Sequence, residues 1–453
     1  MGTGEKSNPN FIHFQGLMDV VHQFLGELGN NPDKQTINKL LSLNIAKNPW
    51  ILRLNSVNEV ISNQQLDKSV TTFDEEWLAF NELVSSFVRL ANQLNPWSIL
   101  QSFDLYTSYL NDLSIAFTNS NRGSLLSDLT RELIGIIIPL ANKLDYQLFY
   151  QEHCNRPRLT YLASILLKIF NNIRSQINDG TQRDKRSIIL FVSNKLCLIY
   201  FKLSNPLLCR NVFANMNNAN LQFNSFQLIE QVQYRYFLGK FYLIKDQLID
   251  SFSHFSWCLQ QCSINNIKNI TMILQLLLPI SLVIGKNPNF NYIKSLFPSN
   301  NLPNFINIYE NLFKNLKIGN FNQYFTIISQ NQDYLKQLNV LLLLTNKSKV
   351  LIIRNLVRKL WKLQGKPTVL NYDSIALILK ISIGNDSNIL IDSFDDLIIQ
   401  NLIINLIDQN LIRGKIIPKS RSVVLSKTDT FNTIDAIYYN KFSYHHADKW
   451  MNE

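Results

Sequence analysis

Apolar residues recur three and four positions apart through most of this 453-residue chain, and this spacing is typical of amphipathic helices. The pattern runs from about Asn10 to Lys366 and is strongest in residues 73–94, 158–177 and 186–203. Short links that carry Asn, Pro or Gly separate the helical segments. Helices joined by short turns predict a solenoid, because each helix pair can bury its apolar face against the next.

One helix pair also has the spacing of a tetratricopeptide repeat. The matching positions are Tyr234, Leu238, Gly239, Tyr242, Ser251 and Phe255. We expect the glycine to let two helices approach closely. The match is partial, because Ser251 stands where Ala is usual, so it predicts helical repeats and no specific ligand.

The pattern changes after Pro367. Residues 374–382 and 394–409 predict two further helices, and residues 411–418 and 422–427 predict two strands around a basic turn. Two helices followed by a two-stranded hairpin are the pattern of a winged helix. The sequence therefore predicts an all-α fold class, in which a TPR-like helical-repeat solenoid is followed by a C-terminal winged helix with a small β-hairpin.

Positive charge is distributed unevenly along the chain, whose formal net charge is +11. Residues 1–150 carry a net charge of −5, whereas residues 151–453 carry +16. Between Tyr334 and Tyr372 there are eight Lys or Arg residues and no Asp or Glu. Charge of one sign repels itself unless a polyanion neutralises it, so we expect nucleic acid or another anionic partner in the C-terminal part. The alternative is a solvated helix face.

Two segments supply the candidate nucleic-acid contacts. In a helix over residues 350–363, basic residues four apart form one stripe, and further basic residues lie on the predicted hairpin. The candidate nucleic-acid-binding residues are Arg354, Arg358, Lys359, Lys362, Lys366, Arg413, Lys415, Lys419, Arg421 and Lys427. The opposite side of the helix presents Leu351, Ile352, Leu356 and Leu360 to the core. Such basic contacts set affinity and register rather than sequence specificity. Trp361 adjoins the stripe and either stacks on a base or packs in the core.

Motifs of the common enzyme classes are missing from the sequence. It contains no P-loop, no GxGxxG after a strand, no HExxH and no GxSxG. His445 and His446 lie near Asp448, but a solvated polar tail explains them better than a metal site. Asp395 and Asp396 are explained by the positive N-terminal end of the second predicted helix. We therefore expect no catalysis, no cofactor and no metal ion.

The cysteines and the apolar runs indicate an intracellular protein. The five cysteines form no CxxC pair, and no further Cys or His pair completes a zinc site with Cys258 and Cys262, so we expect buried reduced thiols. His254 lies among aromatic residues and is expected in the interior. The longest apolar run, Ile270 to Gly285, is short for a bilayer span, and Pro279 within it predicts a buried helix pair broken at the proline.

The helical array and winged helix together resemble the PCI domain of the proteasome lid, the COP9 signalosome and a translation initiation factor, over residues 186–427. Four segments are similar to the PCI subunit of the TREX-2 mRNA export complex, namely residues 95–105, 194–216, 231–252 and 352–362. A paralogue associated with the COP9 signalosome shares much of this pattern and remains an alternative. Residues 1–70 match no family.

The resemblance implies a noncatalytic protein of the nucleus and the nuclear pore periphery, in a complex that couples transcription to mRNA export. It implies a large PCI-bearing scaffold subunit as partner, whose winged helix pairs with that of this chain to form a platform for RNA or DNA. It also implies a small acidic disordered subunit that is shared with the proteasome lid. We expect no membrane insertion. In the alternative, the chain is a pure protein-assembly module of a signalosome-associated PCI complex, and its basic face docks an acidic protein.

The changes of pattern along the sequence predict the domain organisation. We expect a divergent N-terminal helical segment (1–70), N-terminal helical repeats (71–180), helical repeats of the PCI module (181–366), a winged helix (367–430) and a C-terminal tail (431–453). The polar segment 175–187 is expected to form an exposed loop between the two helical arrays.

Overall fold

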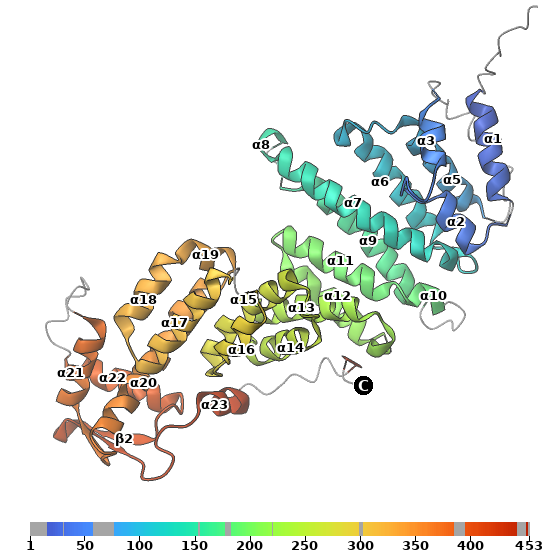
Figure 1. Ribbon diagram of the computed structural model, residues 1–453. Coiled ribbons are helices and arrows are strands. Elements are labelled where there is room, and N and C mark those ends of the chain that lie inside the picture. Colours follow the sequence, from blue (N-terminus) through green and yellow to red (C-terminus); the bar gives the residue numbers. More distant parts are fainter. Residues whose placement is uncertain are drawn as a thin grey trace, which may run out of the picture. The chain divides into compact units, whose positions relative to one another are not determined.

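The computed structural model is built mainly from helices (Figure 1). It describes residues 16–29, 31–57, 77–152, 155–176, 183–219, 221–298, 302–384, 395–441 and 450–451. The chain divides into two compact units, one of residues 1–231 with 450–453 and one of residues 232–449. The predicted fold class, helical repeats followed by a winged helix, is confirmed. The boundary between the units lies at Gln231 and not within residues 175–187.

The first unit is an array of helices connected by short links. Its elements are α1 (Leu17–Leu28), α2 (Lys34–Leu40), α3 (Trp50–Asn55), α5 (Leu78–Gln93), α6 (Ile99–Ala116), η1 (Gly123–Leu126), α7 (Ser127–Gln147), α8 (Phe149–Glu152), α9 (Pro157–Ser175), α10 (Arg183–Arg186), α11 (Ile189–Lys202), η3 (Pro206–Leu208), α12 (Cys209–Asn217) and η4 (Phe223–Ser225). Successive long helices pack on one another, as α5 packs on α6, α6 on α7, and α7 on α9.

Aromatic residues fill the centre of this array. Phe87 of α5 lies between Phe24 and Tyr109, with ring centroids 5.6 and 5.8 Å away. The Tyr109 hydroxyl is buried and donates to the carbonyl oxygen of Leu41 at 2.8 Å, so its polar atom is satisfied inside the core. These contacts join helices that are far apart in the sequence.

The second unit begins within α13 and contains the remaining repeats. Its helices before the winged helix are α13 (Leu228–Ile244), α14 (Leu248–Gln261), α15 (Ile267–Ile284), α16 (Phe290–Ser295), α17 (Asn304–Ile318), α18 (Phe321–Gln330), α19 (Gln332–Gln337) and α20 (Leu341–Leu363). Helix α20 packs on α15, α17 and α18, and it also contacts the winged helix that follows. It therefore joins the repeats of this unit to the domain that carries half of the candidate nucleic-acid-binding residues.

The tetratricopeptide-like pair is formed by α13 and α14. A Cβ atom on Gly239 would lie 3.1 Å from the ring of Phe255, so the expected close approach of the two helices is confirmed. Ser251, which replaces the usual alanine, donates its hydroxyl to the carbonyl oxygen of Gly239 at 2.8 Å. His254 is fully buried and stacks on Tyr242 with 5.5 Å between ring centroids, as expected for an interior histidine.

The prediction that Pro279 breaks its helix is wrong, because α15 continues through it. Proline removes the hydrogen bond from its own nitrogen to the carbonyl four residues earlier, which here belongs to Gln275. The hydroxyl of the buried Tyr309 on α17 donates to that carbonyl oxygen at 3.4 Å. A neighbouring helix thus supplies the donor that the proline lacks, and the sequence around Pro279 does not reveal this partner.

The winged helix contains the predicted helices and hairpin and one further strand. Its elements are β1 (Val369–Asn371), α21 (Tyr372–Ile383), α22 (Asp396–Asp408), β2 (Gly414–Ile417), η5 (Pro418–Ser420) and β3 (Ser422–Leu425). The strands form an antiparallel sheet in the order β1-β3-β2. Leu370, Val423 and Leu425 are buried on the side that faces the core, whereas Val369 and Lys415 lie opposite Val424 on the other side.

Part of the expected C-terminal tail is packed. Residues 434–441 form α23 (Ile434–Lys441), which contacts α15. Gly285 ends α15 in a left-handed conformation (φ 82°), and a Cβ atom there would lie 2.6 Å from that of Ile434. In the first unit, Trp450 is 8% exposed and donates from Nε1 to Asn217 at 2.6 Å. His445 and His446 lie outside the described residues.

Candidate nucleic-acid interface

Helix α20 carries most of the basic segment and spans 23 residues. The residues expected to face the core are buried, namely Leu351, Ile352, Leu356 and Leu360. Arg358, Lys359 and Lys362 are exposed on the C-terminal half of the helix. The helix ends before Gly365, which adopts a left-handed conformation at φ 77° and is followed by the exposed Lys366.

The expectation that Arg354 lies on the same exposed stripe is wrong. Its side chain is only 4% exposed, with Nη2 donating to the carbonyl oxygen of Asn432 at 2.5 Å and Nη1 to Oδ1 of Asn355 at 2.8 Å. Successive residues of a helix are rotated by about 100°, so positions four apart are displaced by about 40°. Two such steps separate Arg354 from Lys362, and this rotation places Arg354 beneath the segment that carries Asn432.

The structure supports core packing for Trp361 rather than stacking on a base. Its indole Nε1 donates to the carbonyl oxygen of Pro367 at 3.1 Å, and its ring centroid lies 5.2 Å from that of Phe431. The Lys366 ammonium lies 6.0 Å from the same ring, within the range of a cation–π contact. Trp361 therefore anchors the start of the winged helix.

The hairpin presents three lysines to solvent. Lys415 on β2 pairs with Val424 and points away from the core, because the alternate residues of β3 are buried. Lys419 lies in the turn η5 between the two strands, and Lys427 follows β3. All three side chains are exposed, as expected for contacts to phosphate.

The two candidate arginines of the hairpin region already have protein partners. Arg421 donates from Nε and Nη2 to both carboxylate oxygens of Asp396 at 2.8 Å and from Nη2 to Asp373 at 3.0 Å. The hydrogen bond to Asp396 is the largest cause of the rise in the pKa of Arg421 above its ordinary value. Arg413 lies 3.6 Å from the carboxylate of Asp429. Arg421 therefore connects the hairpin to the beginnings of α21 and α22. Asp396 interacts with this arginine as well as with the positive N-terminal end of its own helix.

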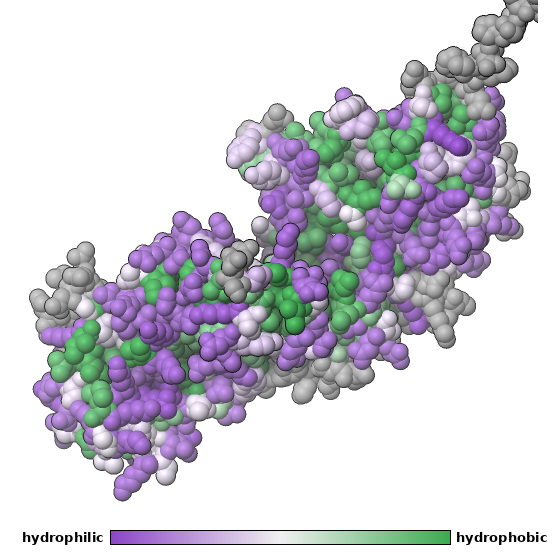
Figure 2. All heavy atoms as spheres, viewed as in Figure 1, coloured by the Kyte–Doolittle hydropathy of each residue, from purple (hydrophilic) through white to green (hydrophobic). Residues whose placement is uncertain are grey.

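Seven of the ten candidate residues are exposed and, in the part of the chain that the structure describes, form no ion pair with a carboxylate. They fall into two groups, the α20 cluster (Arg358, Lys359, Lys362 and Lys366) and the wing lysines (Lys415, Lys419 and Lys427). Figure 2 shows strongly hydrophilic residues over the region that Figure 1 labels α20 and β2. Side chains of this kind bind phosphate oxygens and do not read the base sequence.

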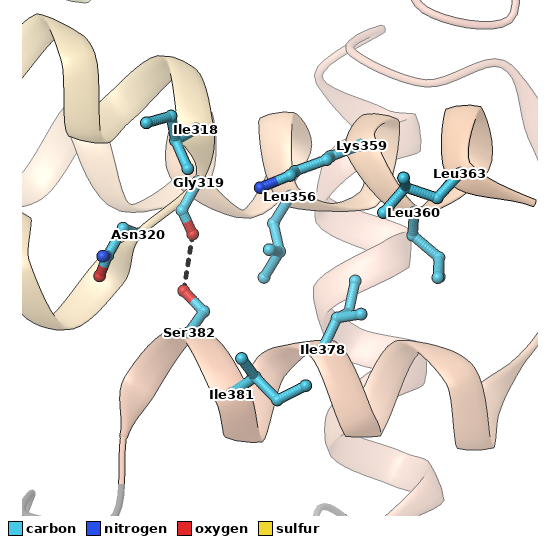
Figure 3. Close-up of a pocket in the computed structure, with 10 residues that line it drawn as sticks. All are labelled: Ile318, Gly319, Asn320, Leu356, Lys359, Leu360, Leu363, Ile378, Ile381 and Ser382. Carbon is cyan, nitrogen blue, oxygen red and sulfur yellow. Dashed lines mark hydrogen bonds between the residues drawn. The ribbon is translucent and has the colours of Figure 1, made fainter.

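An apolar groove that the sequence did not predict lies beside the α20 cluster (Figure 3). The groove has a volume of about 280 Å³ and is lined by Ile318, Gly319, Asn320, Leu356, Lys359, Leu360, Leu363, Ile378, Ile381 and Ser382. Ser382 donates its hydroxyl to the carbonyl oxygen of Gly319 at 2.7 Å and fixes one end. Leu363 and Ile381 are 76% and 72% exposed, so this apolar surface extends to solvent.

Helix α22 adds a second apolar surface to the winged helix. Leu397, Ile398 and Ile404 are 64%, 45% and 51% exposed, although Ile399 and Ile403 already face the core. The sequence contains a signal for this surface, because α22 is apolar over more of its circumference than one buried face requires. Exposed apolar groups gathered on one helix indicate a contact with another protein.

The potential metal ligands are dispersed over the described part of the chain. No group of three or more His, Cys, Asp or Glu residues is arranged there to hold a metal ion. Cys197, Cys209 and Cys258 are buried free thiols, as expected, whereas Cys262 is partly exposed and Cys154 lies outside the described residues. Burial raises the pKa of the Cys258 thiol to about 12, which keeps it protonated and unreactive at neutral pH.

Helix α15 is the one helix among the described residues with the length and composition of a membrane span. Its mean hydropathy is 1.9, but 67% of its residues are buried inside the structure. It is packed between α14, α17 and α20. These contacts identify it as the central helix of the second unit.

Known proteins resemble this chain along most of its length. No family model matches it. It is 28% identical to the nuclear mRNA export protein THP1 of Saccharomyces cerevisiae, over 92% of this chain and 96% of that protein. It is 23% identical to a PCI domain-containing protein of Schizosaccharomyces pombe, over 78% of this chain and 79% of that protein.

An animal protein shows the same relationship. The chain is 22% identical to PCI domain-containing protein 2 of Xenopus laevis, over 79% of this chain and 86% of that protein. The relatives named for a PCI domain agree with the architecture described above, in which helical repeats lead through α20 into a winged helix. The resemblance recognised from the sequence is thus confirmed, and the chain is similar to PCI domain-containing proteins along most of its length.

Proposed function

We propose that this chain is a noncatalytic subunit that acts in nuclear mRNA export. The observation that carries the proposal is its similarity to a nuclear mRNA export protein along nearly the whole length of both chains. Within this proposal, the chain belongs to a TREX-2-type complex at the nuclear pore periphery that couples transcription to export. Its role there is to bind nucleic acid and to hold other subunits together.

The α20 cluster and the wing lysines are the proposed nucleic-acid contacts. Their seven cations are exposed on α20, on the link that follows it and around the hairpin, and the carboxylates described nearby are occupied by Arg413 and Arg421. Because these lysine and arginine side chains are long and flexible, they contact the phosphate backbone of RNA or DNA and contribute no base specificity.

The apolar surface of α22 is the proposed contact for a second winged helix. Leu397 and Ile398 form its exposed N-terminal part, and Ile404 lies about two turns further along. A large PCI-bearing scaffold subunit is the proposed partner, because pairing of two winged helices would cover these residues and would extend the basic surface. The small acidic subunit shared with the proteasome lid is proposed to bind elsewhere on the helical repeats.

Charge reversal in the α20 cluster tests nucleic-acid binding. The double variant Lys359→Glu with Lys362→Glu should bind a single-stranded RNA oligonucleotide more weakly than the wild type. Each lost phosphate contact lowers the slope of log affinity against log salt by about 0.7. The measurement is a fluorescence-anisotropy titration of the full chain at several salt concentrations, with a thermal melt of each variant.

The matched control places the same charge change on another helix. Lys314 and Lys317 are exposed on α17, outside both the α20 cluster and the wing lysines, and their replacement by Glu should leave the salt slope unchanged. Equal binding by the two double variants, with normal melts, would contradict a specific interface at α20. The assembly-module alternative would then be preferred, and it already draws support from the exposed apolar surfaces of α21 and α22.

A further inference from the structure

The apolar groove beside the α20 cluster has two facing walls. Leu356 and Leu360 project into it from α20 (Figure 3). Ile378 and Ile381 line it from α21, so aliphatic side chains stand on both sides (Figure 3). Leu363 and Ile381 form the rim, where both side chains are largely exposed. The groove therefore offers two apolar surfaces between which a flat apolar group fits.

Contacts between α17 and α20 fix the floor of the groove. Gly319 ends α17 in a left-handed conformation (φ 82°), and a Cβ atom there would lie 2.9 Å from Cα of Leu356. Asn355 of α20 donates from Nδ2 to the carbonyl oxygen of Leu316 at 2.9 Å. The groove is therefore formed before any ligand arrives, which reduces the entropy lost on binding.

Positive charge borders the groove on the side of α20. Lys359 is itself one of the lining residues, and its side chain is exposed. Lys362 is also exposed and lies three positions further along, where helix positions are neighbours on the surface. None of the described residues that line the groove is acidic. A ligand that places negative charge at the rim and an apolar group between the walls matches this arrangement.

The uncharged polar side chains of the groove already serve the fold. The Ser382 hydroxyl, which donates to Gly319, also accepts the backbone nitrogen of Phe321 at 2.9 Å. Oδ1 of Asn320 accepts the backbone nitrogen of Gln323 at 3.1 Å at the beginning of α18. These groups are therefore occupied by hydrogen bonds within the chain, and the groove recognises the apolar faces of a ligand rather than its polar edge.

We propose that the groove takes up one unstacked base of a single-stranded nucleic acid, while Lys359 and Lys362 hold the adjoining phosphates. The inference rests on the proposed nucleic-acid contacts of the α20 cluster and names the form of nucleic acid that they favour. Proteins that take up a single base enclose it between aromatic or apolar side chains. The volume of about 280 Å³ is below the range of about 300 to 1,000 Å³ that drug-sized ligands fill, so it suits one base.

This arrangement makes the chain prefer single strands to duplexes. A base in a duplex is paired and stacked, and it enters the groove only after both interactions are broken. A base in a single strand has no partner to lose. Since every base has an apolar face, uptake in the groove gives this preference without selecting a base sequence.

Two strands with the same number of phosphates test the inference. Fluorescence anisotropy measures binding of the full chain to a labelled oligothymidylate and to an abasic strand of the same length, at several salt concentrations. The wild type should bind the thymidine strand about tenfold more tightly, because stacking of one base contributes at this level. Leu363→Ser with Ile381→Ser should remove this preference, while the affinity for the abasic strand and the salt slope stay unchanged.

The matched control removes two exposed apolar side chains outside the groove. Leu342 on α20 and Ile404 on α22 are 73% and 51% exposed, and their replacement by Ser should keep the preference for bases. A thermal melt of each variant confirms that it folds, and the exposure of Leu363 and Ile381 makes their replacement compatible with folding.

The results separate this inference from the proposed function. Salt-dependent binding of the wild type with equal affinity for the two strands would overturn the uptake of a base and leave the phosphate contacts in place. Binding that does not depend on salt would overturn both. A groove variant that keeps the preference for bases but loses a bound protein on affinity purification would assign the groove to a protein contact instead.

Discussion

Arg354 has the spacing in the sequence that predicts an exposed residue, but its side chain is buried in the structure. Its spacing from Arg358 and Lys362 predicts an exposed stripe, but a straight helix rotates that stripe gradually away from solvent. The residue that accepts its hydrogen bond, Asn432, is 78 positions away in the sequence. A pattern that is read within one helix cannot reveal such a partner.

Replacing Arg354 by Leu should reduce stability and leave phosphate binding unchanged. The substitution removes the hydrogen bond that the buried Arg354 guanidinium donates to the half-buried Asn432 carbonyl oxygen, which costs about 1 to 3 kcal/mol. Burial and the charge of Arg358 lower the pKa of Arg354 to about 10, so the guanidinium is still charged at neutral pH. A chemical denaturation curve measures the stability loss, and Arg358→Leu at an exposed position is the control, with a change of only about 0.5 kcal/mol. A variant that melts normally but loses RNA affinity would contradict the burial of Arg354.

Tyr309 provides a second test at the residue scale. Tyr309→Phe should lower the free energy of unfolding by about 1 kcal/mol, because the Gln275 carbonyl oxygen loses the donor that replaces the proline's missing N–H. In a Pro279→Ala background, where the helix supplies its own donor, the same substitution should cost much less. Denaturation of the four proteins in this double-mutant cycle gives the coupling between the two positions. Independent, additive effects would contradict the assigned role of the hydroxyl.

At the scale of elements, sequence patterns predicted the winged helix well but missed its first strand. The helices over 374–382 and 394–409 correspond to α21 and α22, and the hairpin corresponds to β2 and β3. Strand β1 has only three residues, too few to show alternation, and it exists because Val369 pairs with Val424 across the sheet. Helix α23 was missed for a similar reason, since its packing depends on a distant glycine.

Gly285→Ala should loosen α23 from the second unit. A Cβ atom at this position would lie 2.6 Å from that of Ile434, and the left-handed backbone at φ 82° disfavours any side chain. We expect a loss of about 1 to 3 kcal/mol and faster proteolysis of the chain after Phe431. Gly26→Ala is the matched control, because the space around that helical glycine is open and the substitution should be neutral or stabilising. Equal melting of the two variants would argue against the α23 contact.

At the scale of the whole molecule, the sequence predicts the basic surface and the apolar surfaces to different extents. The net charge of +16 in residues 151–453 predicted where the basic surface would be, but it did not distinguish exposed cations from those that pair with carboxylates. Only seven of the ten candidate residues remain available, because Arg354, Arg413 and Arg421 serve contacts within the fold. The apolar surface of α21 could not be located from the sequence, since exposure depends on which neighbours cover a residue, whereas the wide apolar face of α22 is visible in its sequence.

We propose above all that this chain joins an mRNA export complex through its winged helix. The most direct test is affinity purification of the tagged full chain from nuclear extract, with the bound proteins identified by mass spectrometry. The wild type should recover a large PCI-bearing scaffold subunit and a small acidic subunit. A Leu397→Asp with Ile398→Asp variant should lose the scaffold, whereas Ile264→Asp, at a site that is 67% exposed on another part of the second unit, should retain it. Recovery of signalosome subunits, or of no PCI protein at all, would contradict the claim.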